Sequence, residues 1–317
     1  MTRSVLILAG GGGHTGYATI LAEELKGRAE LSFMAPEDEL ISIERLKPYG
    51  PVIKITKPRH PRTNLWSFTF RLMKAFYQSL TRFPRKVDVV VSTGSNFCIP
   101  PALVAWIKGI PVVNLESRVK FTKPSRTALL LQYFAKITAL QWEEQKRFLK
   151  GILFGPLIPN RLVESWNGGY ILVTGGTYGY EELFEAVSAS SLKKVVLQTG
   201  KIDGRKYAEQ HPDWVVFSYD PKFYNVIAGA EVVVSPPGGT PLEAVAYGKH
   251  VVIVKYPEWT KAASRDEIKL FAQKLNAPIV WDISLSNIES AVMEAEKRDI
   301  PKFRDGKKAL ADTIINL

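Results

Sequence analysis

The chain has 317 residues, 46% of them hydrophobic, and a formal net charge of +11. Its length favours two globular domains. The chain has a single cysteine, Cys98, which excludes internal disulfides and thiolate zinc clusters. It contains no run of 18 apolar residues, so no membrane span is predicted. Because Met1 leads directly into an apolar strand with no basic leader or cleavage site, we expect a protein of a reducing compartment that is not exported.

The first half of the chain alternates predicted strands with predicted helices. Apolar, β-rich runs predict strands at residues 4–8, 31–35, 51–55, 88–92 and 111–115. Apolar residues at helical spacing predict helices at residues 16–26, 65–82, 99–108 and 125–136. This alternation is typical of a doubly wound parallel α/β sheet.

A glycine loop, "GGGGHT" at residues 10–15, follows the first predicted strand. Glycine has no Cβ, so the backbone here can take positive φ and approach a ligand closely. Residues 11–16 also fit the GxGxxG fingerprint, with Glu37 about 20 residues further on as a ribose-binding acid. An NAD-dependent or flavin enzyme is therefore one hypothesis, although it leaves His14 unexplained.

The excess positive charge lies in the first half, where residues 1–158 carry 23 Lys and Arg against 11 Asp and Glu. It is densest at residues 57–86, which contain eight basic residues and no acidic one. An anionic membrane surface and nucleic acid are the two anionic partners that this charge could bind. Nucleic acid is not favoured, because no groove-reading or base-stacking motif is present.

Residues 57–86 also contain a predicted amphipathic helix. One face of this helix has a row of large apolar side chains: Trp66, Phe70, Met73, Tyr77 and Leu80. Two interpretations stay open, in which this face either packs in the core or belongs to a basic helix that binds an anionic membrane surface. The membrane interpretation assigns the contact to Arg62, Trp66, Phe70, Arg71, Lys74 and Phe76.

A second series of elements fills the other half of the chain. Its predicted strands are residues 170–174, 194–198, 214–218, 231–235 and 251–254. Its predicted helices lie near residues 181–189, 221–229, 240–248, 265–275, 286–297 and 303–315. Gly and Pro between residues 155 and 169 predict domains 1–157 and 158–317, with the last helix able to pack back on the first domain. Two such domains predict a cleft, with ligands at the carboxyl ends of the strands.

Two further glycine loops follow strands of the second domain, "VTGGTYGYEEL" at 173–183 and "VVVSPPGGTPLEAVAYGK" at 232–249. In the latter, Thr240 is a candidate N-cap with Pro241 at the first helical position. An open helix N-terminus there would bind a phosphate, with further N–H groups from Gly175, Gly176 and Thr177. Glu243 either closes a capping box or accepts hydrogen bonds from sugar hydroxyls.

These motifs carry a family resemblance. The loop at 10–15 and "VVVSTGSNFCIPPALVAWIKGIPVVNLES" at 89–117 resemble the acceptor and membrane subunit of the eukaryotic enzyme that adds the second N-acetylglucosamine to dolichol-diphosphate-linked GlcNAc. "VVLQTGK" at 195–201 and "AEVVVSPPGGTPLEAVAYGKHVVIV" at 230–254 resemble its catalytic subunit. The chain resembles the two fused, and is more loosely similar to the bacterial transferase that adds GlcNAc to undecaprenyl-linked muramyl peptide.

The resemblance implies a GT-B glycosyltransferase of two Rossmann-like domains facing a cleft. It implies an inverting transfer from UDP-GlcNAc to a polyprenyl- or dolichyl-diphosphate-linked sugar, at the cytoplasmic face of the membrane and with no cofactor. Because no Asp-x-Asp motif follows an apolar strand, we also expect metal independence, with helix N-termini and loop amides stabilising the leaving UDP.

The resemblance also implies site residues. The acceptor-binding residues are Gly12, Gly13, Thr93, Gly94 and Ser95. The nucleotide-sugar-binding residues are Gly175, Gly176, Thr177, Gly238, Gly239, Thr240 and, for the ribose, Glu243. An imidazole is suited to remove the acceptor proton at neutral pH, so His14 is the first candidate for the base. Glu116 is either the base, the residue that orients His14, or an acceptor ligand. The segment at 264–275 lacks the family's Asn-His-Gln or Asp-Gln pattern, so the resemblance assigns no donor-sugar contact to Asp266 or Glu267.

Two other functions stay open. A non-hydrolysing UDP-GlcNAc epimerase with the same fold would need neither a membrane nor an acceptor. A scaffold whose basic half recruits a separate transferase would need no catalysis, although the complete donor-type second half argues against it.

Overall fold

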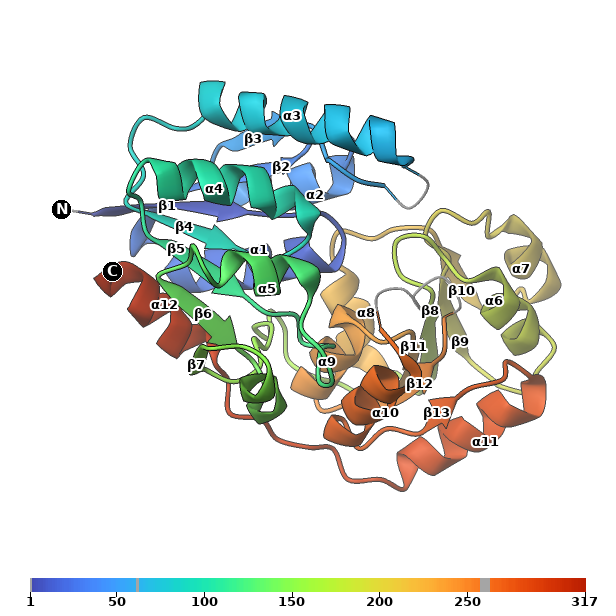
Figure 1. Cartoon of the computed structure of the whole chain (residues 1–317). Helices are drawn as coiled ribbons and strands as arrows, with labels where there is room; N and C mark the ends of the chain where they lie inside the picture. The colour runs from blue at the N-terminus through green and yellow to red at the C-terminus, as the bar shows by residue number, and fades with distance from the viewer. Residues whose placement is uncertain (1, 61–62, 257–262) are drawn as a thin grey trace. The chain divides into compact units, whose positions relative to one another are not determined.

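The computed structural model describes residues 2–60, 63–256 and 263–317 (Figure 1). The chain forms two compact units, one of Met1–Leu157 with Phe303–Leu317 and the other of Ile158–Lys302. The boundary expected from the sequence lies at the same residues, and the last fifteen residues return to the first unit.

The first unit is built on one sheet of parallel strands. In chain order they are β1 (Arg3–Leu8), β2 (Ala29–Pro36), β3 (Val52–Ile55), β4 (Val89–Ser92), β5 (Val112–Leu115), β6 (Ile137–Leu140) and β7 (Ile152–Leu153). Their spatial order is β3-β2-β1-β4-β5-β6-β7, so the sheet is doubly wound. The inner strands are continuous apolar runs because both of their faces are covered.

Helices lie on both faces of this sheet (Figure 1). They are α1 (Gly13–Leu25), α2 (Leu40–Leu46), α3 (Leu65–Thr81), α4 (Ile99–Ile107), α5 (Arg126–Leu131) and α12 (Lys307–Asn316), with 3-10 turns at Lys47–Tyr49, Asn96–Cys98 and Glu143–Arg147. The predicted helix 125–136 is too long, because the chain turns after Leu131 to enter β6. Helix α2 and strands β6 and β7 were not predicted from the sequence.

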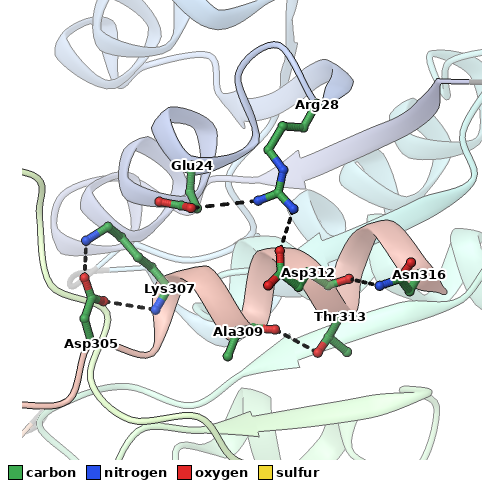
Figure 2. Close-up of polar contacts among 8 residues, drawn as sticks. All are labelled: Glu24, Arg28, Asp305, Lys307, Ala309, Asp312, Thr313 and Asn316. Atoms are coloured by element: carbon green, nitrogen blue, oxygen red, sulfur yellow. Dashed lines mark hydrogen bonds and ion pairs between the residues drawn. The ribbon is translucent and has the colours of Figure 1, made fainter.

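The C-terminal helix α12 completes the core of the first unit. Leu310, Ala311 and Ile314 are fully buried in the cluster that also holds residues of β1 and α1. Figure 2 shows Arg28, which lies in the turn after α1, between Glu24 and Asp312, with which it forms ion pairs. These charged side chains are partly exposed, so burial of the apolar face contributes more than the ion pairs do.

The second unit repeats the architecture. Its parallel strands are β8 (Tyr170–Thr174), β9 (Val195–Gln198), β10 (Val215–Phe217), β11 (Ala230–Ser235), β12 (His250–Val254) and β13 (Ile279–Val280), in the spatial order β10-β9-β8-β11-β12-β13. Its helices are α6 (Glu181–Ser188), α7 (Arg205–Gln210), α8 (Phe223–Gly229), α9 (Gly239–Ala246), α10 (Arg265–Lys274) and α11 (Leu285–Glu296). The sequence analysis missed the short elements α7 and β13. Each unit is thus a Rossmann-like α/β sheet.

The packing of α12 makes a prediction about stability. Leu310→Ala should lower the free energy of unfolding by about 2–5 kcal/mol, because it opens a cavity in the core of the first unit. Asp312→Asn, which removes only the partly exposed ion pair with Arg28, should cost less than about 1 kcal/mol. Chemical denaturation followed by circular dichroism measures both. Equal losses would show that the ion pair holds the helix as strongly as the core does.

Candidate functional site

The carboxyl edge of the first sheet brings together the loops predicted to bind the acceptor. Strands β1 and β4 are neighbours, but the chain leaves them in opposite directions, which makes this the switch point where doubly wound sheets bind ligands. The two loops lie against each other, since a Cβ added to Gly10 would lie 2.6 Å from the Ser95 Cβ and 3.0 Å from the Gly94 carbonyl oxygen. Gly12 and Gly13 are exposed at the start of α1, with nothing within 4 Å of a Cβ built on either.

His14, the second residue of α1, lies half-buried between these loops. Its Nδ1 is 2.7 Å from the carbonyl oxygen of Thr93. A carbonyl oxygen only accepts, so Nδ1 bears the proton and the Nε2 lone pair is left for another group. Gly94 has φ +94°, and a Cβ there would lie 3.1 Å from the imidazole, so a larger residue would displace the ring. This geometry suits a general base.

The charges around His14 favour its neutral form. Burial lowers the pKa of His14 below the ordinary 6.5, and the positive charges of Lys57 and Arg118 lower it further, while the hydrogen bond to Thr93 raises it. The imidazole is therefore unprotonated at neutral pH, as a base requires.

Glu116 follows β5 and is fully buried. One carboxylate oxygen accepts a 2.6 Å hydrogen bond from the Ser117 amide, and the other accepts a 2.8 Å bond from the Ser125 amide. Burial raises the pKa of Glu116, and these two bonds oppose the rise. Because each oxygen accepts a hydrogen bond within its own loop, Glu116 orders residues 116–125. Its roles as the base, as the residue that orients His14 or as an acceptor ligand stay predictions.

Side chains after β6 hold the carbonyl groups of this same loop. Gln141 Nε2 donates to the carbonyl oxygen of residue 116 at 2.7 Å, and Trp142 Nε1 donates to that of residue 118 at 2.7 Å. Gln145 Nε2 donates to the carbonyls of residues 117 and 120, both at 2.9 Å. The sequence analysis missed these residues. The segment "QWEEQ" at 141–145 contains no local signal for these roles, because the carbonyl groups that its side chains bind lie 24 to 28 residues earlier in the chain.

The loop of residues 116–125 contains a buried cation, Arg118. It is only 4% exposed, and its guanidinium carbon lies 4.1 Å from the centre of the Tyr17 ring. Its backbone amide donates to the Tyr17 hydroxyl at 2.7 Å. Within the described part of the chain, Nη1 of Arg118 has no hydrogen-bond acceptor. The ring contact stabilises the cation by about 0.5–2 kcal/mol, whereas an unmade hydrogen bond on a buried charged group costs more than about 1–3 kcal/mol.

An ion pair that was not predicted from the sequence borders the first glycine loop. Lys57 Nζ and Glu39 Oε1 are 2.8 Å apart. Gly11 has φ +89°, and a Cβ there would lie 2.7 Å from the same carboxylate oxygen. The nearby Glu37, considered above as a ribose ligand, accepts a 3.0 Å hydrogen bond from the Thr56 hydroxyl.

In the second unit, the strongest candidate for an anion site is the N-terminus of α9. The helix begins at Gly239 with Gly238 as its N-cap, and neither a capping side chain nor an acidic residue lies in its first turn. The predicted N-cap Thr240 is therefore wrong, because the extended backbone at Gly238 ends the preceding loop two residues earlier. The predicted capping box is wrong for the same reason, because Glu243 lies beyond the first turn of α9. Sugar hydroxyls remain the proposed partner of the half-buried Glu243.

The loop after β8 offers fewer free amides than the sequence analysis expected. The Gly176 amide already donates to the Thr174 hydroxyl at 2.9 Å. Helix α6 begins only at Glu181, and Glu181 and Glu182 lie in its first turn, so its N-terminus repels an anion. Gly175 and Thr177 remain candidates. Among the described residues, no group of three His, Cys, Asp or Glu side chains could hold a metal ion.

Helix α3, the predicted membrane helix, has its apolar row on the outside. Trp66 is 88% and Phe70 71% exposed, and Met73, Tyr77 and Leu80 are also exposed. The buried face is formed by Ala75, Gln78 and Ser79. The core-facing interpretation of the apolar row is therefore wrong. No helix in the described ranges is long and apolar enough to span a bilayer.

The other predicted membrane residues differ among themselves. Lys74 is exposed, whereas Phe76 is half-buried and is not part of the exposed row. Arg71 Nε donates to the Lys57 carbonyl at 2.9 Å, and its Nη2 lies 2.8 Å from His60 Nε2. Arg71 therefore holds α3 to the preceding segment. Arg62 lies outside the described residues.

The chain is similar to several known proteins. The relative from Synechococcus elongatus named UDP-N-acetylglucosamine–N-acetylmuramyl-(pentapeptide) pyrophosphoryl-undecaprenol N-acetylglucosamine transferase is 26% identical over 64% of this chain, and the match spans only 61% of that relative. The protein of the same name from Gloeothece citriformis is 24% identical over 99% of this chain and 96% of its own length.

Solved structures show the fold. MurG from Acinetobacter baumannii has a TM-score of 0.69 at 19% identity, with 100% of both chains covered. UDP-GlcNAc 2-epimerase from Neisseria meningitidis has a TM-score of 0.65 at 14% identity, covering 99% of this chain and 100% of that one. Residues 170–312 match the model of the glycosyltransferase family 28 C-terminal domain. The chain is thus a glycosyltransferase with the GT-B fold, and the part of it that resembles family 28 is residues 170–312.

Proposed function

We propose that the chain transfers GlcNAc from UDP-GlcNAc to a sugar linked to a lipid diphosphate. The observation that carries the proposal is the hydrogen bond between His14 Nδ1 and the Thr93 carbonyl, which leaves Nε2 as a base beside an open glycine loop. The matched donor-type domain at 170–312 and the printed names of the relatives support the choice of substrates.

The proposed reaction is a single displacement. The acceptor hydroxyl oxygen attacks the anomeric carbon of GlcNAc while His14 Nε2 takes the hydroxyl proton. The bond from the anomeric carbon to the phosphate oxygen breaks, its electron pair leaves with UDP, and the configuration inverts. In this account the N-terminal amides of α9 stabilise the charge that develops on the diphosphate, and no metal is required.

Two acceptors fit this reaction. The relatives act by name on a muramyl peptide linked to undecaprenyl diphosphate. The motifs at 10–15 and 89–117 instead support an acceptor with GlcNAc on a polyprenyl or dolichyl diphosphate, as in N-glycan biosynthesis. We propose the second acceptor on the strength of those motifs.

We further propose peripheral binding of α3 to the cytoplasmic face of the membrane. Its outward apolar row would enter the headgroup boundary, and nearby Lys and Arg each contribute about 1 kcal/mol on an anionic surface. The epimerase alternative offers no reason for an exposed row of this size, because its substrate is water-soluble.

The proposal is tested by incubating the protein with UDP-GlcNAc and short-chain lipid diphosphates bearing either GlcNAc or a muramyl peptide, followed by mass spectrometry. We expect one added GlcNAc on the GlcNAc acceptor, and nearly the same rate in EDTA. Addition of GlcNAc only to the muramyl peptide acceptor would instead indicate a function in peptidoglycan synthesis. Conversion of UDP-GlcNAc to its 2-epimer without an acceptor would establish the epimerase instead.

His14→Ala should lower kcat by about 10²–10⁴-fold, because the general base acts in the transition state. His250→Ala, at the start of β12, is the matched control and should leave kcat unchanged. In the wild type, kcat/KM should fall with decreasing pH only below 6.5, since the lowered pKa keeps His14 neutral down to that value. A His14→Ala variant with near wild-type turnover would remove His14 from the mechanism.

Trp66→Ser with Phe70→Ser should release the protein from vesicles of phosphatidylserine and phosphatidylcholine, because it removes apolar burial in the headgroup region. Leu285→Ser with Met293→Ser, at two exposed positions of α11, is the control and should not change binding. Sedimentation at low and high salt separates the apolar contribution from the screened charge attraction. A wild-type protein that stays in the supernatant at low salt would contradict membrane binding.

A further inference from the structure

The guanidinium of Arg118 has an unsatisfied donor in a loop that is otherwise held by many hydrogen bonds. The Glu116 carboxylate fixes the amides of residues 117 and 125, and the side chains of Gln141, Trp142 and Gln145 fix four of the loop's carbonyl groups. The Arg118 cation itself has a ring contact and an Nη1 with no acceptor within the described ranges. A loop ordered in this way holds a buried cation in place before any ligand is present.

Arg118 lies beside the first turns of α1. Tyr17, whose ring it contacts, is one turn after His14, and the His14 and Tyr17 rings are 6.2 Å apart between centroids. The helix starts at two exposed glycines and has no acidic residue in its first turn. An N-terminus of this kind attracts anions.

The other charged groups near His14 also favour a bound anion. Lys57 and Arg118 both lower the pKa of His14 through their positive charges. Glu39, the acid against the glycine loop, is already paired with Lys57. Arg118 has no ion pair with any residue in the described ranges, so a bound anion would meet its positive charge.

We propose that Arg118 binds the diphosphate of the lipid-linked acceptor. The identity of the acceptor rests on the proposed function, and the chemistry recognised is a diphosphate ester. A guanidinium presents a planar fork of donors that matches two phosphate oxygens. The amides of His14 and Thr15 already donate to the carbonyls of Gly11 and Gly12, so those of Gly12 and Gly13 would supply the further donors. UDP contains the same group, but Arg118 belongs to the unit that holds the predicted acceptor loops.

Isothermal titration calorimetry with farnesyl diphosphate and with UDP tests the assignment without requiring transfer. Arg118→Met keeps most of the side-chain volume against Tyr17 but removes the charge. It should raise the Kd for farnesyl diphosphate about 10- to 100-fold and change the Kd for UDP less than about twofold. Arg118→Lys should give an intermediate loss, because it keeps the charge without the fork. Arg147→Met removes an equal but exposed charge and should change neither constant.

A farnesyl diphosphate Kd unchanged in Arg118→Met, or an equal loss for UDP, would overturn the assignment. A second measurement covers a variant that fails to fold: in wild-type protein, the Nε–H NMR signal of Arg118 should shift with farnesyl diphosphate and not with UDP, and an unmoved signal would also overturn it. Because binding is read directly, absence of GlcNAc transfer would count against the proposed function and leave this result intact.

Discussion

The hydrogen bond from His14 Nδ1 to the Thr93 carbonyl is the interaction on which the candidate site of the first unit depends. It joins the loops after β1 and β4, at the point where the doubly wound sheet changes direction. It also fixes the tautomer, so the free lone pair is on Nε2. The bond is possible because Gly94 leaves space for the ring at a backbone conformation that favours glycine. The glycines before His14 allow the two loops to approach closely, so that the His14 ring can lie against the loop after β4.

In the proposed function, the two units stabilise negative charge with different groups: side-chain cations in the first and backbone amides in the second. The first unit has side-chain cations: Lys57 is paired with Glu39, and Nη1 of Arg118 has no acceptor among the residues that the structure describes. The second unit offers backbone amides at the uncapped start of α9. Fixed amides need no reorganisation when charge develops, which suits a departing diphosphate, whereas a buried cation suits a group that stays bound throughout the reaction.

The parallel sheets and the glycine loops could be predicted from the sequence because their signals are local. Buried parallel strands are continuous apolar runs, and glycine loops at their ends are contiguous motifs. Arg118 and Gln145 could not be found in this way, because their roles depend on Tyr17 and on loop carbonyls brought together by folding. Helix α3 was ambiguous for a related reason: its period shows an apolar face, but only the position of Gln78, which accepts a hydrogen bond from the Thr56 amide, shows that the opposite face is buried.

The central claim is that His14 is a neutral base with its proton on Nδ1. The most direct measurement is NMR of protein with ¹⁵N-labelled histidine, titrated with pH, because two-bond couplings distinguish the two ring nitrogens. The account predicts a His14 ring with protonated Nδ1, unprotonated Nε2 and a pKa below 6.5. A ring with protonated Nε2, or with a pKa above 6.5, would contradict it.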